Sequence, residues 1–183
     1  MGNKVGNQAF GHVANGLNAA TLSLSCMACG QIQWQVGDYT VGGNTVSTKA
    51  GLWRECVTIG DAETCQTTDF DSRDSSYERN IKAMRALMII GILDVFTSLI
   101  FNAMSLCCPS RRRFGYTAGA GCAFSAGLFF MIVMAIFVND IKDDRLSYGS
   151  AFGLDIGAWI LIWISCGFQI AARMKLRDES TCN

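Results

Sequence analysis

The chain has 183 residues, of which half are hydrophobic, only 16% are charged and one is proline. This composition is unusual for a soluble domain of this size and is typical of a membrane protein. The formal net charge is zero, so the chain lacks the strongly basic balance of a nucleic-acid-binding protein, and no nucleic acid is expected among its partners.

Long apolar stretches give the organisation of the chain. Three of them, at 86–106, 116–138 and 152–172, are long enough to cross a bilayer core, which needs roughly 20 helical residues. A fourth stretch, at about 10–30, is weaker because His12, Asn15 and Asn18 dilute it. Either it is a fourth span, or it is a cleaved signal peptide whose apolar core follows Lys4. As a span, it makes the count even and puts both termini on one side.

Basic residues predict the orientation. Three follow the second apolar stretch and three follow the last one: Arg111, Arg112, Arg113, Arg173, Lys175 and Arg177. The positive-inside bias then makes the loop 107–115 and the tail 173–183 cytoplasmic. The segments at about 31–82 and 139–150 become outer loops. No repeat or composition shift marks a second domain, so residues 1–183 are expected to form a single four-span unit.

The outer loops are acidic. Residues 31–80 hold four basic and eight acidic residues, a net charge of −4, and residues 139–147 have a net charge of −1. One interpretation is that acidic residues are tolerated outside while Lys and Arg are retained inside. The other is that clustered carboxylates concentrate cations at a narrow opening.

The first outer loop has the pattern of a small sheet. Short runs rich in β-branched residues, at 32–36, 39–41 and 45–48, are separated by glycines, which predicts short antiparallel strands. The expected fold is an all-α transmembrane four-helix bundle that carries a small antiparallel extracellular β-sheet. Cys56 and Cys65 enclose eight residues, and a disulfide is expected between them in an oxidising exterior. A metal site would need more ligands than this loop offers.

Several motifs in this loop resemble the claudins. A tryptophan precedes a Val-containing run at Trp34, the triplet Gly51-Leu52-Trp53 follows, and Cys56 and Cys65 come after it with eight residues between them. The run from Lys82 to Ile89, which contains Arg85, is similar to the start of the second span in that family. The resemblance implies a four-helix protein of the plasma membrane at cell-cell junctions. There it would mediate adhesion and form a paracellular barrier or ion pore, in membrane lipid, as a homo- or hetero-oligomer with claudin-like proteins in cis and trans. Family geometry would make Trp34 and Trp53 hold the sheet at the helix ends, although both could simply be interfacial belt residues.

The wider superfamily leaves other functions open. It contains peripheral myelin and epithelial membrane proteins and auxiliary channel subunits, so an auxiliary channel subunit or a myelin-type membrane organiser is the alternative function. The chain ends Ser180-Thr181-Cys182-Asn183, unlike the short hydrophobic tail of claudins, and this difference puts docking to a PDZ scaffold in doubt. In a pore, Glu55, Asp61 and Glu63 would favour cations. Gln66 is neutral where some pore-forming claudins carry a charge, so barrier and pore both stay open.

The remaining cysteines, acidic residues and small residues are expected to serve mainly in packing, hydrogen bonding or lipid attachment. Cys107 and Cys108 lie beside the arginine cluster, where reversible palmitoylation is expected. The Cys26 and Cys29 thiols are expected to pack. Asp94 is expected to hydrogen-bond to Asn15, Asn18 or Ser98, and Asp155 to reach the membrane interface. Small residues recur every fourth position at Gly149, Gly153, Gly157 and at Gly115, Gly119, Ala123, which predicts close helix packing. His12 lacks a nucleophile beside it and no glycine-rich phosphate loop occurs, so neither enzymatic activity, a cofactor nor a metal is expected.

Overall fold

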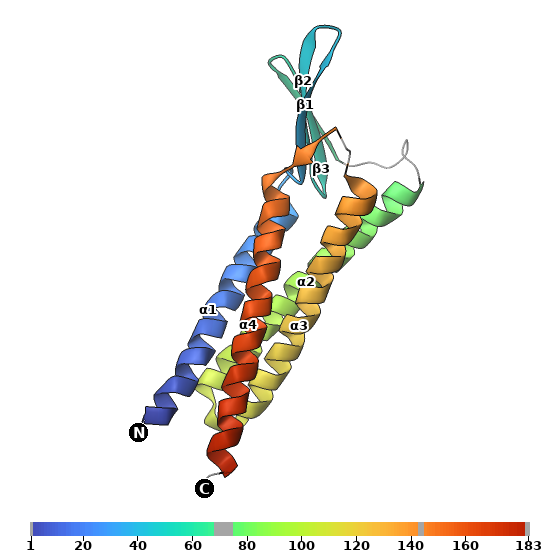
Figure 1. Cartoon of the computed structure of the whole chain (residues 1–183). Coiled ribbons are helices and arrows are strands. Elements are labelled where there is room, and N and C mark those ends of the chain that lie inside the picture. The colour runs from blue at the N-terminus through green and yellow to red at the C-terminus, as the bar shows by residue number, and fades with distance from the viewer. Residues whose placement is uncertain (1, 68–74, 143–144, 182–183) are drawn as a thin grey trace. The chain divides into compact units, whose positions relative to one another are not determined.

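The computed structural model describes residues 2–67, 75–142 and 145–181. Its principal helices are α1 (Gly2–Gly30), α2 (Ser75–Cys107), α3 (Arg112–Ile136) and α4 (Ser150–Thr181), as labelled in Figure 1. A 3₁₀ turn, Pro109–Arg111, joins α2 to α3, and a π-helical turn, Phe137–Ile141, follows α3. The helices extend past the predicted spans, and α2 begins within the segment predicted as an outer loop. The length of an apolar stretch gives only the minimum length of a membrane helix, because the helix can continue through polar residues at either end.

Three helical segments of the described chain are long and apolar enough to cross a membrane: Ser76–Cys107, Pro109–Ile141 and Ser150–Leu176. The prediction of three strong spans is therefore confirmed in length and composition. The weaker stretch at 10–30 is also helical, as part of α1, but α1 does not reach the same apolar composition.

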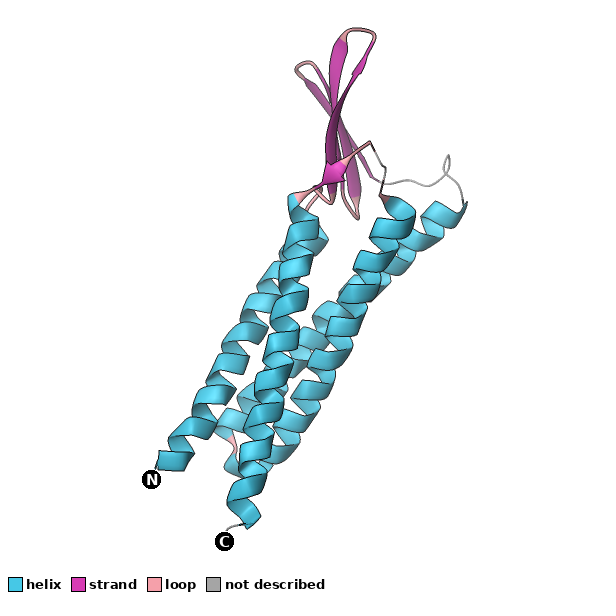
Figure 2. Cartoon of the chain, viewed as in Figure 1, coloured by secondary structure: helices cyan, strands magenta, loops and turns pink. Residues whose placement is uncertain are grey.

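The chain divides into two compact units. The sheet unit comprises Leu24–Ile89 and Phe130–Ile156, and the helical unit comprises Met1–Ser23, Ile90–Phe129 and Gly157–Asn183. Each helix contributes one part to each unit, while all the strands belong to the sheet unit. Figure 2 distinguishes the helices from the strands by colour.

The sheet is antiparallel, with the strand order β4-β3-β2-β1-β5. Its strands are β1 (Gln35–Val41), β2 (Asn44–Ala50), β3 (Arg54–Ile59), β4 (Ala62–Thr67) and β5 (Ser147–Tyr148). Gly42 and Gly43 have φ angles of 60° and 86°, the left-handed values that a tight hairpin between β1 and β2 requires and glycine adopts without strain. The small sheet is confirmed, but β5 was not predicted, because a two-residue strand leaves no periodic pattern in the sequence.

Buried polar side chains join all four helices inside the helical unit. Asn18 donates to the Ser98 hydroxyl at 3.0 Å, Ser98 donates to the Gly119 carbonyl at 2.8 Å, and Gln169 donates to Ser98 at 3.2 Å. Ser165 donates to the side-chain amide oxygen of Asn18, Oδ1, at 2.6 Å. Such bonds contribute on average about 0.6 kcal/mol each in a membrane protein. The Asn18 that weakens the apolar pattern of α1 thus has an interior partner.

The two acidic residues within the apolar stretches, half-buried Asp94 and buried Asp155, differ from their predictions. The Ser125 hydroxyl donates to Asp94 Oδ2 at 2.5 Å, so the expected partners Asn15, Asn18 and Ser98 were wrong. Asp155 is fully buried, and neither of its carboxylate oxygens has a hydrogen-bond partner in the described chain. It does not reach an interface because it shares the buried face of α4 with Ala151 and Ala158, four residues before and three after it.

The predicted small faces are used in part. A Cβ at Gly115 would lie 2.7 Å from the Phe101 carbonyl oxygen, and one at Gly119 would lie 2.5 Å from Gln169 Oε1. A Cβ at Gly149 would overlap the Gln33 backbone, whereas one at Gly153 would meet nothing within 4 Å. Close backbone approach therefore selects some of these glycines, but the fourfold spacing does not identify which ones.

Candidate functional site

Trp34 connects the end of α1 with β1. Its side chain is 1% exposed, and its indole nitrogen donates to the Ala28 carbonyl at 2.8 Å. That carbonyl lies in the last turn of α1, where helix carbonyls lack intrahelical partners. The indole also packs edge-on against Phe137, with ring centroids 5.3 Å apart. A carbonyl at the end of α1 thus receives its hydrogen bond from the residue immediately before β1.

Gly51 permits a close approach of two backbones. A Cβ at this position would lie 2.6 Å from both the Gln31 carbonyl oxygen and Ile32 Cα, so any larger residue would displace the main chain. The Gly51 amide donates to the Arg54 carbonyl at 2.9 Å and closes the turn between β2 and β3. Leu52, which follows, is fully buried.

Trp53 and Arg85 complete the attachment from the helix side. The Trp53 indole donates to the Cys29 carbonyl at 2.9 Å, in the last turn of α1. Arg85 on α2 donates from Nε to the Leu52 carbonyl at 2.7 Å, and its Cζ lies 4.8 Å from the centre of the Trp53 ring. We call Trp34, Gly51, Leu52, Trp53 and Arg85 the anchor cluster, because it joins the turn between β2 and β3 to α1 and α2.

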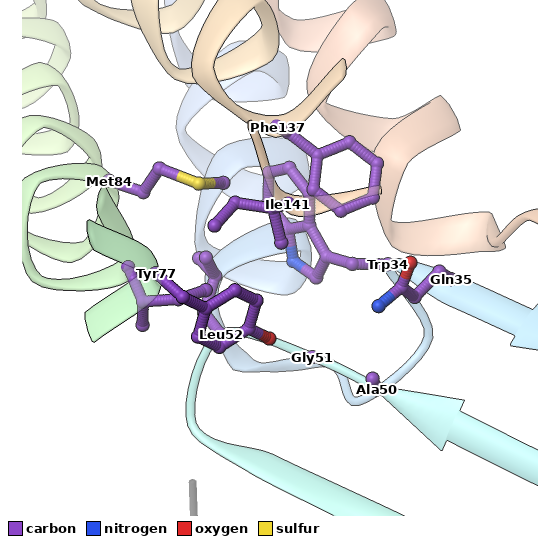
Figure 3. Close-up of a pocket in the computed structure, with 10 residues that line it drawn as sticks. Trp34, Gln35, Ala50, Gly51, Leu52, Tyr77, Met84, Phe137 and Ile141 are labelled. Carbon is purple, nitrogen blue, oxygen red and sulfur yellow. The ribbon is translucent and has the colours of Figure 1, made fainter. Parts of the chain in front are cut away.

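The space around the anchor cluster is nearly filled (Figure 3). A cavity of only about 10 Å³ remains there, barely the volume that one water molecule occupies. It is lined by Trp34, Gln35, Ala50, Gly51, Leu52, Tyr77, Ile81, Met84, Phe137 and Ile141. The anchor cluster therefore packs as a structural joint, with room for about one water molecule.

Cys56 and Cys65 form the expected disulfide. They lie directly opposite each other on β3 and β4, with an S–S distance of 2.04 Å and a Cα–Cα distance of 4.0 Å. Glu63 lies near the two sulfur atoms. Both sulfurs are committed to the disulfide, so they cannot serve as thiolate ligands, and this group has no metal-binding chemistry.

The residues considered for a pore are not gathered on one face. Glu55 is opposite Gln66, while Glu63 is opposite Thr58. Side chains alternate between the two faces of a strand, so Glu55 and Gln66 share one face and Glu63 shares the other with the disulfide. Asp61 lies in the turn between β3 and β4 and is exposed.

The segment before α4 adds contacts that the sequence did not indicate. A Cβ at Gly37 on β1 would lie 2.5 Å from Leu146 Cδ2, and the Ser150 hydroxyl donates to Gln33 Oε1 at 2.8 Å. The Lys142 ammonium lies 5.0 Å from the centre of the Tyr148 ring. Alternation in Leu146-Ser147-Tyr148 was the available signal, but three residues are too few to distinguish a strand from a helix entry.

The remaining cysteines differ in accessibility. Cys107 and Cys108, at the end of α2, are exposed, as a lipidation site would require. Their palmitoylation stays a prediction. Of the C-x-x-C pair, Cys26 is also exposed, while Cys29 is half-buried.

Comparison with known protein families gives a match over most of the chain. The family model described as PMP-22/EMP/MP20/Claudin matches residues 13–172. This range contains the whole anchor cluster, the disulfide and all five strands. A comparison with curated proteins gives no match. Proteins of the matched family are generally structural membrane proteins. On the extent of the match, the chain belongs to the PMP-22/EMP/MP20/Claudin family.

Proposed function

We propose that this protein is a cell-junction membrane protein that mediates adhesion between neighbouring cells and forms a paracellular barrier. The observation that carries the proposal is the anchor cluster. It fixes an exposed, disulfide-stapled sheet to the ends of two helices through three hydrogen bonds that involve Trp34, Trp53 and Arg85. A rigid sheet held outside the membrane is suited to repeated contact between cells, because little conformational freedom is lost on binding.

The proposal includes four spans with both termini in the cytoplasm. Within the helical unit, Phe10 near the start of α1 contacts Phe168 on α4, with ring centroids 5.8 Å apart. Arg113 at the start of α3 donates to the Leu176 carbonyl near the end of α4 at 3.1 Å. The first part of α1, the last turns of α4 and the arginine cluster thus gather at one end of this unit, which supports α1 as a fourth span.

A tag placed after Asn183 tests this topology. It should stain only in permeabilised cells, whereas a tag in the turn at Gly42 and Gly43 should stain in intact cells. A mature protein that starts near Gly30 would show that the first helix is removed as a signal peptide.

The sheet offers a surface for partners. Tyr39 and Ile59 are 45% and 52% exposed and both face Val46, on β2 between their own strands. This places two large apolar side chains on one sheet face. We infer that this face of the sheet, with Tyr39 and Ile59, contacts claudin-like proteins. These partners would be copies of this chain or different members of the family.

Expression in an epithelial monolayer that lacks the protein tests the function. The protein should concentrate at lateral cell contacts and raise transepithelial resistance, and the double variant Tyr39→Ser, Ile59→Ser should do neither as effectively while still reaching the surface. Exposed Val138→Ser, which lies outside the sheet, is the control. Co-purification with an ion channel and no change in resistance would instead favour an auxiliary subunit.

A further inference from the structure

We propose that the helical unit carries a binding site for the phosphate of an anionic phospholipid, between the first turns of α3 and the last turns of α4. An open cleft of about 280 Å³ lies there, lined by Arg113, Phe114, Thr117 and Arg173. Two guanidinium groups and one aromatic ring therefore border the same space.

The two arginines supply the phosphate-binding groups. Arg113 donates one hydrogen bond from Nη2 to the Leu176 carbonyl at 3.1 Å, which orients its guanidinium and leaves further N–H groups. Arg173 forms no hydrogen bond or ion pair with the residues that the structure describes, and both side chains are exposed. A guanidinium donates two parallel hydrogen bonds to a phosphate, and this geometry suits it better than the ammonium of lysine.

Phe114 favours a lipid over a free anion. Its side chain is 61% exposed, and its ring meets Phe101 edge-on with centroids 6.0 Å apart. Next to it, the Arg113 and Arg173 side chains present charge. An aromatic ring adds nothing to the binding of inorganic phosphate, but it can pack against the glycerol and upper acyl chain of a phospholipid.

The position of the cleft agrees with this ligand. The membrane-capable segment Pro109–Ile141 begins close to it and Ser150–Leu176 ends close to it, at the depth where headgroups border the apolar core. The flanking segments 107–115 and 173–183 contain six basic and two acidic residues. Basic pockets between helices at this depth recognise anionic headgroups.

Native mass spectrometry of the full-length chain in detergent tests the site, with phosphatidylserine, phosphatidylcholine and inorganic phosphate as separate probes. One phosphatidylserine should bind in preference to phosphatidylcholine. The pair Arg113→Gln, Arg173→Gln should weaken phosphatidylserine binding by about fivefold for each lost cation, or roughly 25-fold together. Phe114→Ala should weaken it as well, and inorganic phosphate should not displace the lipid.

The matched control is Arg111→Gln, Lys175→Gln, which removes the same charge at the same end but outside the cleft lining. At high ammonium acetate concentration it should change binding by less than about twofold, because salt screens charges that do not contact the bound phosphate directly. The pair Arg113→Lys, Arg173→Lys keeps the charge and should retain part of the affinity for phosphatidylserine. If the glutamine pair does not fold, the lysine pair replaces it as the test of the cleft. Equal losses in the cleft and control pairs would mean general surface charge and would overturn the proposal. The proposal would also be overturned if inorganic phosphate displaced the lipid and Phe114→Ala left phosphatidylserine binding unchanged.

Discussion

The guanidinium of Arg85 lies over the ring of Trp53, with Cζ 4.8 Å from the ring centre, while Arg85 Nε binds the carbonyl of the preceding Leu52. One side chain from α2 thus holds both the backbone and the ring of the turn between β2 and β3. Trp53 in turn binds the Cys29 carbonyl at the end of α1. The turn is therefore a three-way junction among α1, α2 and the sheet.

We expect Arg85→Met to destabilise the protein and to reduce its delivery to the cell surface. The variant keeps side-chain length but loses a charged hydrogen bond worth about 1.5–3 kcal/mol and the contact with the Trp53 ring. The measurement is thermal unfolding in detergent, together with surface labelling. The control is Lys82→Met, which removes a cation paired with Glu78 on the helix surface and should cost less than about 1 kcal/mol.

Gly51→Ala should cost about 1–3 kcal/mol, because the added methyl group overpacks a site bordered by the Gln31 and Ile32 backbone. Gly153→Ala provides the comparison, since a Cβ there meets nothing within 4 Å and alanine favours a helix by about 1 kcal/mol. Unfolding of both variants under identical conditions should give effects of opposite sign. If Gly51→Ala and Gly153→Ala were equally stable, the backbone around Gly51 would have to shift without cost, which would contradict the prediction.

Cys56→Ala should lower the free energy of unfolding of the sheet by a little under about 3 kcal/mol, the chain-entropy effect of opening so short a loop. Limited proteolysis of intact cells should then cut between β3 and β4, and surface delivery should fall. Cys26→Ala, which removes an exposed free thiol, should have no such effect. Free thiols at both positions in non-reducing mass mapping of the parent protein would contradict the prediction.

The dispersed carboxylates lead us to expect a seal without charge selectivity. Glu55, Asp61 and Glu63 lie on two faces and a turn, so one protomer does not present them as a single cluster. A sodium chloride dilution potential across expressing monolayers should be the same for the parent and for Asp61→Asn, Glu63→Gln. Asp140→Asn controls for loss of outer charge elsewhere. A sodium-to-chloride permeability ratio that falls in the double variant alone would establish a cation pore.

The sequence by itself determined the elements whose physical signals are local. Apolar length located three helices, and β-branched runs separated by glycines located part of the sheet. The spacing of two cysteines in a segment predicted to be extracellular, where the medium is oxidising, indicated the disulfide. The motif residues Trp34, Gly51 and Arg85 were singled out from the sequence, but their spacing of 17 and 34 residues along the chain contains no information about their mutual contacts.

Only the tertiary structure decided which polar groups meet. Asp94 binds Ser125, 31 residues away, and Asn18 binds Ser98, 80 residues away. Such pairs depend on the rotation and depth of each helix, which are set by packing between helices and not by the composition of either one. The division of Glu55 and Glu63 between two faces likewise depends on strand register, and the cleft of about 280 Å³ arises only where α3 and α4 bring Arg113 and Arg173 together.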